Sequence, residues 1–229
     1  MAASHCLGLI GGLGVGAAIH YYRELAAEHQ KRNRSLDLVM VHAEVERVLG
    51  YIGDNKLGAL ADYLAGLITR LSRAGADVAA IPAVAPHICA PQLTGLSPLP
   101  LIDLVGEVAR EVDARGLKRV ALFGTRYAIE TNLFGRLPGV EIVRPQPGEI
   151  DLIHKAYNEI VRAGRGSAEQ LVRLTDIAHT LRRRDGVEAI LLAGTDLSLL
   201  FDDTNTDFPA IDCARVHIDA IVGRLLGDR

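Results

Sequence analysis

Short, mostly apolar runs alternate with longer amphipathic runs along this 229-residue chain. The apolar runs predict strands at residues 6–10, 36–41, 78–81, 119–123, 140–143 and 189–192. The amphipathic runs predict helices at residues 17–30, 56–73, 103–113, 149–161, 168–184 and 212–226. Strands that are apolar throughout and separated by long helices are typical of parallel sheets covered on both faces. The pattern therefore predicts an α/β fold.

Glycine-rich turns divide this pattern into two similar halves. Residues 11–14 follow the first strand, and Gly124-Thr125 follows the strand at 119–123 in the corresponding place. This repetition suggests an internal duplication with two similar lobes, each a parallel sheet flanked by helices. Because ligands bind beyond the carboxyl ends of strands in such sheets, we expect the active site in a cleft between the two lobes.

The stretch from Pro91 to Pro100 is the predicted boundary between the lobes. Pro91, Pro98 and Pro100 are expected to interrupt any helix or central strand. We therefore expect a first lobe of residues 1–98 plus 212–229 and a second lobe of residues 99–211.

Composition argues against several classes of protein. The formal net charge is -3, the pI is near 6.2, and there is no Trp and no basic run interleaved with aromatic residues, so a nucleic-acid partner is not expected. Residues 1–9 lack the basic start and apolar run of a signal peptide, and no segment approaches ~18 consecutive apolar residues. We expect a cytoplasmic protein that does not cross a membrane.

Cofactor motifs are missing from the sequence. Cys6, Cys89 and Cys213 are widely spaced and form no CxxC or His/Cys pair, which argues against disulfides and structural zinc. The turn after the first strand has the spacing GxGxG rather than GxGxxG, and His42 stands where a dinucleotide site needs an acidic residue. The sequence therefore predicts neither a metal nor a nicotinamide cofactor.

Four motifs follow one another across nearly the whole chain: Leu7-Gly8-Leu9-Ile10-Gly11-Gly12-Leu13-Gly14, Ala74-Gly75-Ala76-Asp77, Val120-Ala121-Leu122-Phe123-Gly124-Thr125-Arg126, and Ala210-Ile211-Asp212 with His217. Each is common in α/β proteins, but together and in this order they resemble the aspartate/glutamate racemase family. The resemblance implies a two-domain racemase that needs neither pyridoxal phosphate nor another cofactor, and a homodimer. Family members remove the α-proton of an acidic amino acid with one cysteine and return a proton from a second cysteine on the opposite face.

Both family cysteines are replaced in this chain. The resemblance aligns the family's Cys-Asn-Thr-x-His segment with Ala83-Val84-Ala85-Pro86-His87, which places Ala83 at the first cysteine position. It aligns the family's Gly-Cys-Thr-Glu segment with Ala193-Gly194-Thr195-Asp196, which places Gly194 at the second. Val84 and Ala85 also replace polar residues that would face the substrate. We therefore expect the two-thiol mechanism to be impaired or replaced.

Three residues are candidates for the missing acid and base. His42 follows the second strand, where a histidine is a candidate general base, and it is also interpretable as a solvated strand-end histidine. Asp196 matches an acidic family position, or it caps residues 197–200. Cys213 begins the closing helix, a location that lowers a thiol pKa, and its alternative role is that of a small buried residue.

Candidate substrate-binding groups remain in both halves. Gly12, in the first turn, lets backbone N–H groups approach an anion, as well as forming a tight turn. Arg47, in the loop after the second strand, and Arg165 resemble the basic residues that family members direct at substrate carboxylates, although both also fit exposed surface arginines. Thr125 and Thr195 supply hydroxyls at strand ends.

The resulting hypothesis is a racemase-family protein that acts on a small amino acid or related carboxylate. Two alternatives stay open. One is a non-catalytic carboxylate-binding homologue, and the other is a lyase or isomerase that uses a single acid or base other than cysteine.

Overall fold

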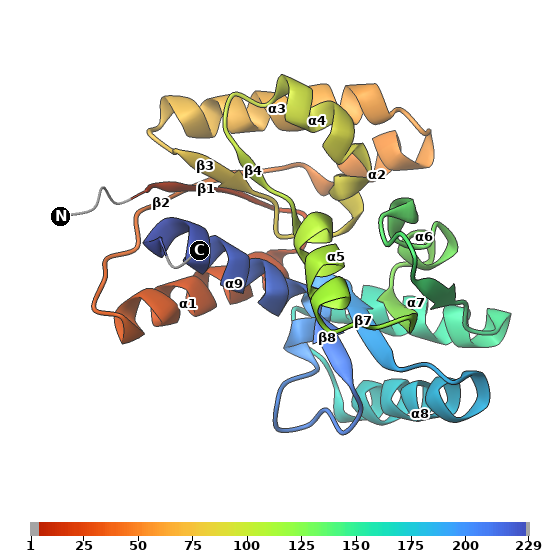
Figure 1. The fold of residues 1–229 in the computed structure, drawn as a ribbon. Helices are drawn as coiled ribbons and strands as arrows, with labels where there is room; N and C mark the ends of the chain where they lie inside the picture. The colour runs from red at the N-terminus through yellow and green to blue at the C-terminus, as the bar shows by residue number, and fades with distance from the viewer. Residues whose placement is uncertain (1–4, 228–229) are drawn as a thin grey trace. The chain divides into compact units, whose positions relative to one another are not determined.

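The computed structural model describes residues 5–227, so residues 1–4, which begin the segment considered for an export signal, and residues 228–229 lie outside it. Two compact units make up the chain: residues 1–104 with 217–229, and residues 105–216 (Figure 1). Among the described helices, none combines the length and the apolar character that a membrane crossing requires.

The first unit is built on a parallel sheet with the strand order β2-β1-β3-β4. Its strands are β1 (Leu7–Gly11), β2 (Leu38–His42), β3 (Val78–Ala80) and β4 (Leu101–Ile102). Helices α3 (Leu57–Arg73) and α4 (Ala90–Leu96) pack together on one face, while α1 (Val15–Lys31) and α9 (Cys213–Leu226) cover the other (Figure 1). The central strand β1 is buried over its whole length, which accounts for its wholly apolar sequence.

The second unit repeats this plan with the strand order β6-β5-β7-β8. Its strands are β5 (Arg119–Gly124), β6 (Glu141–Val143), β7 (Ala189–Ala193) and β8 (Ala210–Asp212). Its helices are α5 (Leu104–Ala114), α6 (Arg126–Glu130), α7 (Pro147–Ala163) and α8 (Ala168–Asp185). The first strand of each unit lies second in its sheet and the third strand lies beside it, so the loops after β1 and β5 correspond, as do those after β3 and β7. The predicted α/β fold with two similar parallel sheets is confirmed.

A short 3-10 turn is the next element after the third strand of each sheet. After β3 comes η1 (Ala85–Cys89), and after β7 comes η3 (Thr195–Leu199); a further turn, η2 (Leu133–Gly135), follows α6. The turns η1 and η3 are each hydrogen-bonded to the start of a later helix. The His87 ring accepts a hydrogen bond from the Leu104 N–H at 3.2 Å, and the Ser198 hydroxyl donates to Asp212 at 2.9 Å.

A buried polar network joins the two helices on one face of the first sheet. His217 Nε2 donates to the carbonyl oxygen of Ile102 at 2.9 Å, so Nδ1 is the acceptor for the Tyr21 hydroxyl at 3.1 Å. Burial, and to a lesser degree the nearby His87, lowers the pKa of His217 to about 3. His217 is therefore neutral at physiological pH and links α1, α9 and β4.

Two sequence-based expectations about local structure were wrong. Arg47 does not lie in a loop but in the helix α2 (Val45–Gly53), which forms because Val48 and Ile52 are one turn apart and both bury against the core. Pro91 does not interrupt a helix but lies in the first turn of α4, where proline is tolerated because that N–H has no partner within the helix.

Candidate functional site

Gly12 and His42 lie together at the carboxyl end of the first sheet. The Ala43 N–H donates to the Gly11 carbonyl at 2.8 Å, which joins the loops after β1 and β2. Gly12 has a φ of +90°, and a Cβ there would lie 2.9 Å from both the Ala43 nitrogen and His42 Cδ2. This close approach leaves room only for glycine. His42 is exposed beside it.

Two tyrosines hold Arg47 in one orientation. Arg47 Nε donates to the Tyr51 hydroxyl at 3.1 Å, and the guanidinium carbon lies 4.6 Å from the centre of the Tyr63 ring. The Tyr63 hydroxyl in turn accepts the Glu44 N–H at 2.8 Å, immediately after the loop that carries His42. The hydrogen bond to Tyr51 is the main reason that the pKa of Arg47 is raised. The guanidinium is therefore a positioned cation beside the end of β2.

The segment after β3 is apolar and closely packed. Ala83 and Val84 are buried, whereas Ala85 is half-buried. His87 Nδ1 donates to the Ala83 carbonyl at 2.8 Å, and its Nε2 accepts the Leu104 N–H described above. Both ring nitrogens of His87 are thus engaged by the backbone in one neutral tautomer. These bonds to the backbone on both sides of the ring give this histidine a structural role.

Thr125 and Gly124 occupy the corresponding end of the second sheet. The Thr125 hydroxyl oxygen caps α6 by accepting the Ala128 N–H at 3.1 Å. A Cβ at Gly124 would lie only 2.5 Å from the Ala193 carbonyl oxygen, so the ends of β5 and β7 approach each other closely. Thr125 and Gly194, the residues that follow this pair, therefore emerge side by side.

Thr195 and Asp196 lie inside the turn η3, and each is 1% exposed. The expected capping of residues 197–200 by Asp196 is wrong, because the turn already begins at Thr195 and its N-cap is Gly194. Burial of a carboxylate needs compensating interactions, so Asp196 is a tightly held group at the end of β7.

Tyr157, which no sequence motif marks, packs directly on Gly194. A Cβ at Gly194 would lie 2.8 Å from Tyr157 Cζ and 3.0 Å from Cδ2, and closer still to Cε2. Tyr157 comes from α7, which packs against β5 and η3. The ring therefore occupies the space that a side chain at position 194 would need.

His154 and Asn158 share this face of α7. His154 Nδ1 accepts the Arg126 N–H at 3.2 Å, and the Asn158 amide lies 3.0 Å from Nε2. Burial, followed by the charge of Arg126, lowers the pKa of His154. A signal for this group exists in the sequence, because His154, Tyr157 and Asn158 have the i, i+3, i+4 spacing of one helix face.

Arg165 is exposed in the loop between α7 and α8. The next residue, Gly166, donates its N–H to the Leu199 carbonyl at 3.2 Å, and a Cβ at Gly166 would overlap Leu200. The structure thus attaches the Arg165 loop to the end of η3, the turn that begins with Thr195.

All three cysteines are buried thiols. Burial raises the pKa of Cys6 and of Cys89 to about 11, and the Cys89 thiol donates to the Pro86 carbonyl. Burial, and then the charge of Asp212, also raises the pKa of Cys213. The expectation that the helix start lowers this pKa was wrong, because Cys213 is fully buried and desolvation disfavours the thiolate.

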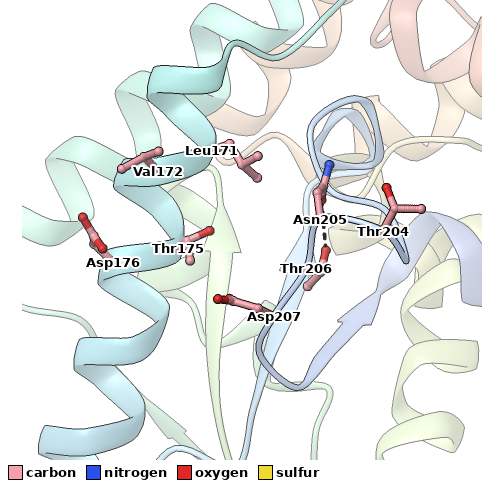
Figure 2. Close-up of a pocket in the computed structure, with 8 residues that line it drawn as sticks. All are labelled: Leu171, Val172, Thr175, Asp176, Thr204, Asn205, Thr206 and Asp207. Carbon is pink, nitrogen blue, oxygen red and sulfur yellow. Dashed lines mark hydrogen bonds between the residues drawn. The ribbon is translucent and has the colours of Figure 1, made fainter.

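A surface pocket of about 340 Å³ lies elsewhere in the second unit, between α8 and the loop before β8 (Figure 2). Its lining residues are Leu171, Val172, Thr175, Asp176, Thr204, Asn205, Thr206 and Asp207. None of the predicted site residues lines it. In the part of the chain that the structure describes, no group of His, Cys, Asp and Glu is arranged to hold a metal ion.

Comparison with known proteins gives a consistent result. The family model for Asp/Glu/hydantoin racemase matches residues 10–221. A candidate Asp/Glu racemase from Yersinia pestis superimposes with a TM-score of 0.82 at 21% identity, over 97% of this chain and 99% of that one. An aspartate racemase homologue from Pyrococcus horikoshii superimposes with a TM-score of 0.81 at 20% identity, over 96% and 99%.

A third similar structure carries a different activity. The maleate isomerase from Pseudomonas putida superimposes with a TM-score of 0.60 at 16% identity, over 97% of this chain and 92% of that one. At these identities the structural likeness establishes the shared fold. The family model matches most of the chain and therefore establishes family membership. This protein belongs to the Asp/Glu/hydantoin racemase family.

Proposed function

We propose that this protein is an isomerase that acts on a small amino acid or related carboxylate without pyridoxal phosphate, by a mechanism in which proton exchange between two thiols is replaced. The observation that carries the proposal is the state of the thiols. Each cysteine is buried with a raised pKa, and positions 83 and 194 hold alanine and glycine. A buried thiol of raised pKa is a poor base at neutral pH.

Polar groups at the strand ends support recognition of a carboxylate. Arg47 is held by Tyr51 and Tyr63, and a guanidinium with a fixed orientation suits the two oxygens of a carboxylate. In the second unit, Thr125 supplies a hydroxyl at the end of β5 and Arg165 supplies a second cation, whereas Thr195 is buried inside η3. The Gly12 turn allows close approach of backbone N–H groups.

His42 is the proposed base. It is exposed beside Gly12, and an imidazole nitrogen with a free lone pair can accept a proton. The imidazole accepts the α-proton, and the electron pair of the broken C–H bond moves into the adjacent carboxyl group as an enediolate. Water then protonates the opposite face of this carbon, which inverts the configuration, and His42 releases its proton to the solvent; return of the proton from His42 to the original face would regenerate the starting enantiomer. Asp196 orients the polar groups at the end of β7.

Exchange of the α-proton with solvent deuterium tests this function. The panel contains both enantiomers of Asp and Glu, other amino acids and a 5-substituted hydantoin, at high protein concentration in D₂O, with NMR detection. We expect deuterium incorporation for at least one compound, and at least a tenfold lower rate in His42→Asn. His5→Asn, which changes another exposed histidine, is the matched control.

Thermal shift with mono- and dicarboxylates tests binding separately. We expect stabilisation of the wild-type protein that is lost in Arg47→Ala and kept in Arg23→Ala, which changes an arginine on α1. Stabilisation without exchange would identify a carboxylate-binding protein, and exchange without inversion would identify a reaction with a single base. Absence of both effects across the panel overturns the proposal.

A further inference from the structure

The contact between Tyr157 and Gly194 determines which residue fits at position 194. The Tyr157 ring fills the space beside the Gly194 Cα so closely that even a methyl group there would overlap it. Gly194 has φ −155° and ψ 115°, an extended conformation that any residue adopts. The backbone therefore does not require glycine at this position, and the neighbouring ring does.

The neighbours of Tyr157 are hydrogen-bonding groups at the same end of the sheet. One turn away on α7, His154 holds the Arg126 N–H, and Asn158 lies against the His154 ring. Gly194 joins β7 to η3, so the ring lies at a strand end, where ligands bind in parallel sheets. Tyr157 as a residue is half-buried, and its ring packs against Gly194.

The protonation state of the phenol follows from this environment. Burial raises the pKa of Tyr157, and the negative charge of Asp196 raises it further. The hydroxyl therefore keeps its proton at physiological pH. It is a donor to an anionic oxygen and not a base.

We propose that the Tyr157 hydroxyl is the hydrogen-bond donor that the second unit offers to a carboxylate or enediolate oxygen of the substrate, in the place that a side chain at position 194 would otherwise occupy. The inference deepens the proposed function and rests on it. A neutral donor strengthens its hydrogen bond as charge develops on the oxygen, without being consumed. The ring also narrows the space at the end of β7, which favours a small acid.

A double-mutant cycle tests the placement without any ligand. Gly194→Ala should lower the denaturation midpoint of the wild-type protein, and the same change should cost less in a Tyr157→Ala background, because the ring that it overlaps is gone. Gly148→Ala, in the first turn of α7 with open space around it, is the control and should cost little in either background. An equal cost of Gly194→Ala in both backgrounds overturns the placement.

Tyr157→Phe tests the donor role, because it removes the hydroxyl and keeps the ring on Gly194. We expect the best carboxylate of the panel to bind tenfold to a hundredfold more weakly, on the order of the loss of one hydrogen bond to a charged group. Binding of the corresponding primary amide should change less. The denaturation midpoint reports whether the variant remains folded.

The outcomes separate this inference from the proposed function. If the wild-type protein binds a carboxylate and Tyr157→Phe binds it equally well, the donor role is wrong and the proposed function stands. If the wild-type protein neither binds nor exchanges any compound of the panel, the proposed function fails and the donor role fails with it.

Discussion

His217 makes its hydrogen bonds in one tautomer only, and this couples the stability of the first unit to pH. The ring is neutral because burial lowers its pKa to about 3, whereas an unfolded histidine titrates near 6.5. Below pH ~6.5 the His217 side chain binds a proton in the unfolded chain and stays neutral in the folded chain. The contribution of neutral His217 to stability is therefore complete above pH ~6.5 and is lost as the pH falls toward 3.

We expect His217→Gln to flatten this dependence. Between pH 6.5 and 4.5, denaturant titrations should show that the variant loses less stability than the wild-type protein, by up to about 1.4 kcal/mol per pH unit. His5→Gln, at an exposed position, should retain the wild-type slope. Identical slopes in His217→Gln and the wild-type protein would contradict the assignment.

Individual residues of the candidate site were predictable from the sequence only where they follow the end of a strand. Thr125 directly follows β5, and Thr195 and Asp196 come shortly after β7, so the rule for parallel sheets places them at one edge. Tyr157 could not be found in this way, because its contact with Gly194 depends on how α7 is rotated against the sheet. The high pKa of Cys213 was missed because the sequence does not show that its thiol is fully buried.

At the level of elements, α8 begins with a reciprocal cap. The Ser167 hydroxyl accepts the Gln170 N–H at 3.2 Å, and the Gln170 side chain accepts the Ser167 N–H at 2.9 Å. The cap directly follows the loop that carries Arg165, in which the Gly166 N–H donates to the Leu199 carbonyl at the end of η3. The start of α8 therefore also determines where Arg165 lies.

We expect Ser167→Ala to destabilise the protein by about 1 kcal/mol in denaturant titrations. Ser167→Asp retains an acceptor for the Gln170 N–H, so it should lose little or no stability. Equal losses in both variants would show that the cap contributes nothing and that another property of Ser167 is responsible.

The long elements were predictable from hydrophobic pattern, and the short ones were not. Strands such as β1 and β7 are apolar throughout, and helices such as α3 have a clear buried stripe. In α2 only two residues are buried, Val48 and Ile52, and glycines interrupt the pattern. Helix α4 has a proline in its first turn, and it is too short to show a clear helical period of apolar residues.

At the level of the whole molecule, we expect the native protein to have no reactive thiol. Cys6, Cys89 and Cys213 are buried in both units, and burial raises the pKa of each. Iodoacetamide at mildly alkaline pH should label the native protein very slowly and the denatured protein at all three positions, as read by mass spectrometry. Rapid labelling of one cysteine in the native protein would restore a thiol to the list of candidate acids and bases.

The division of the chain also sets an order for its synthesis. Residues 105–216 form one uninterrupted unit, whereas the first unit needs residues 217–229 in addition to residues 1–104. Tyr21 on α1 meets its partner His217 only when α9 has been made. During synthesis on the ribosome, the second unit is therefore the first whose sequence is complete. The first unit keeps one face of its sheet incompletely covered until α9 has been synthesised.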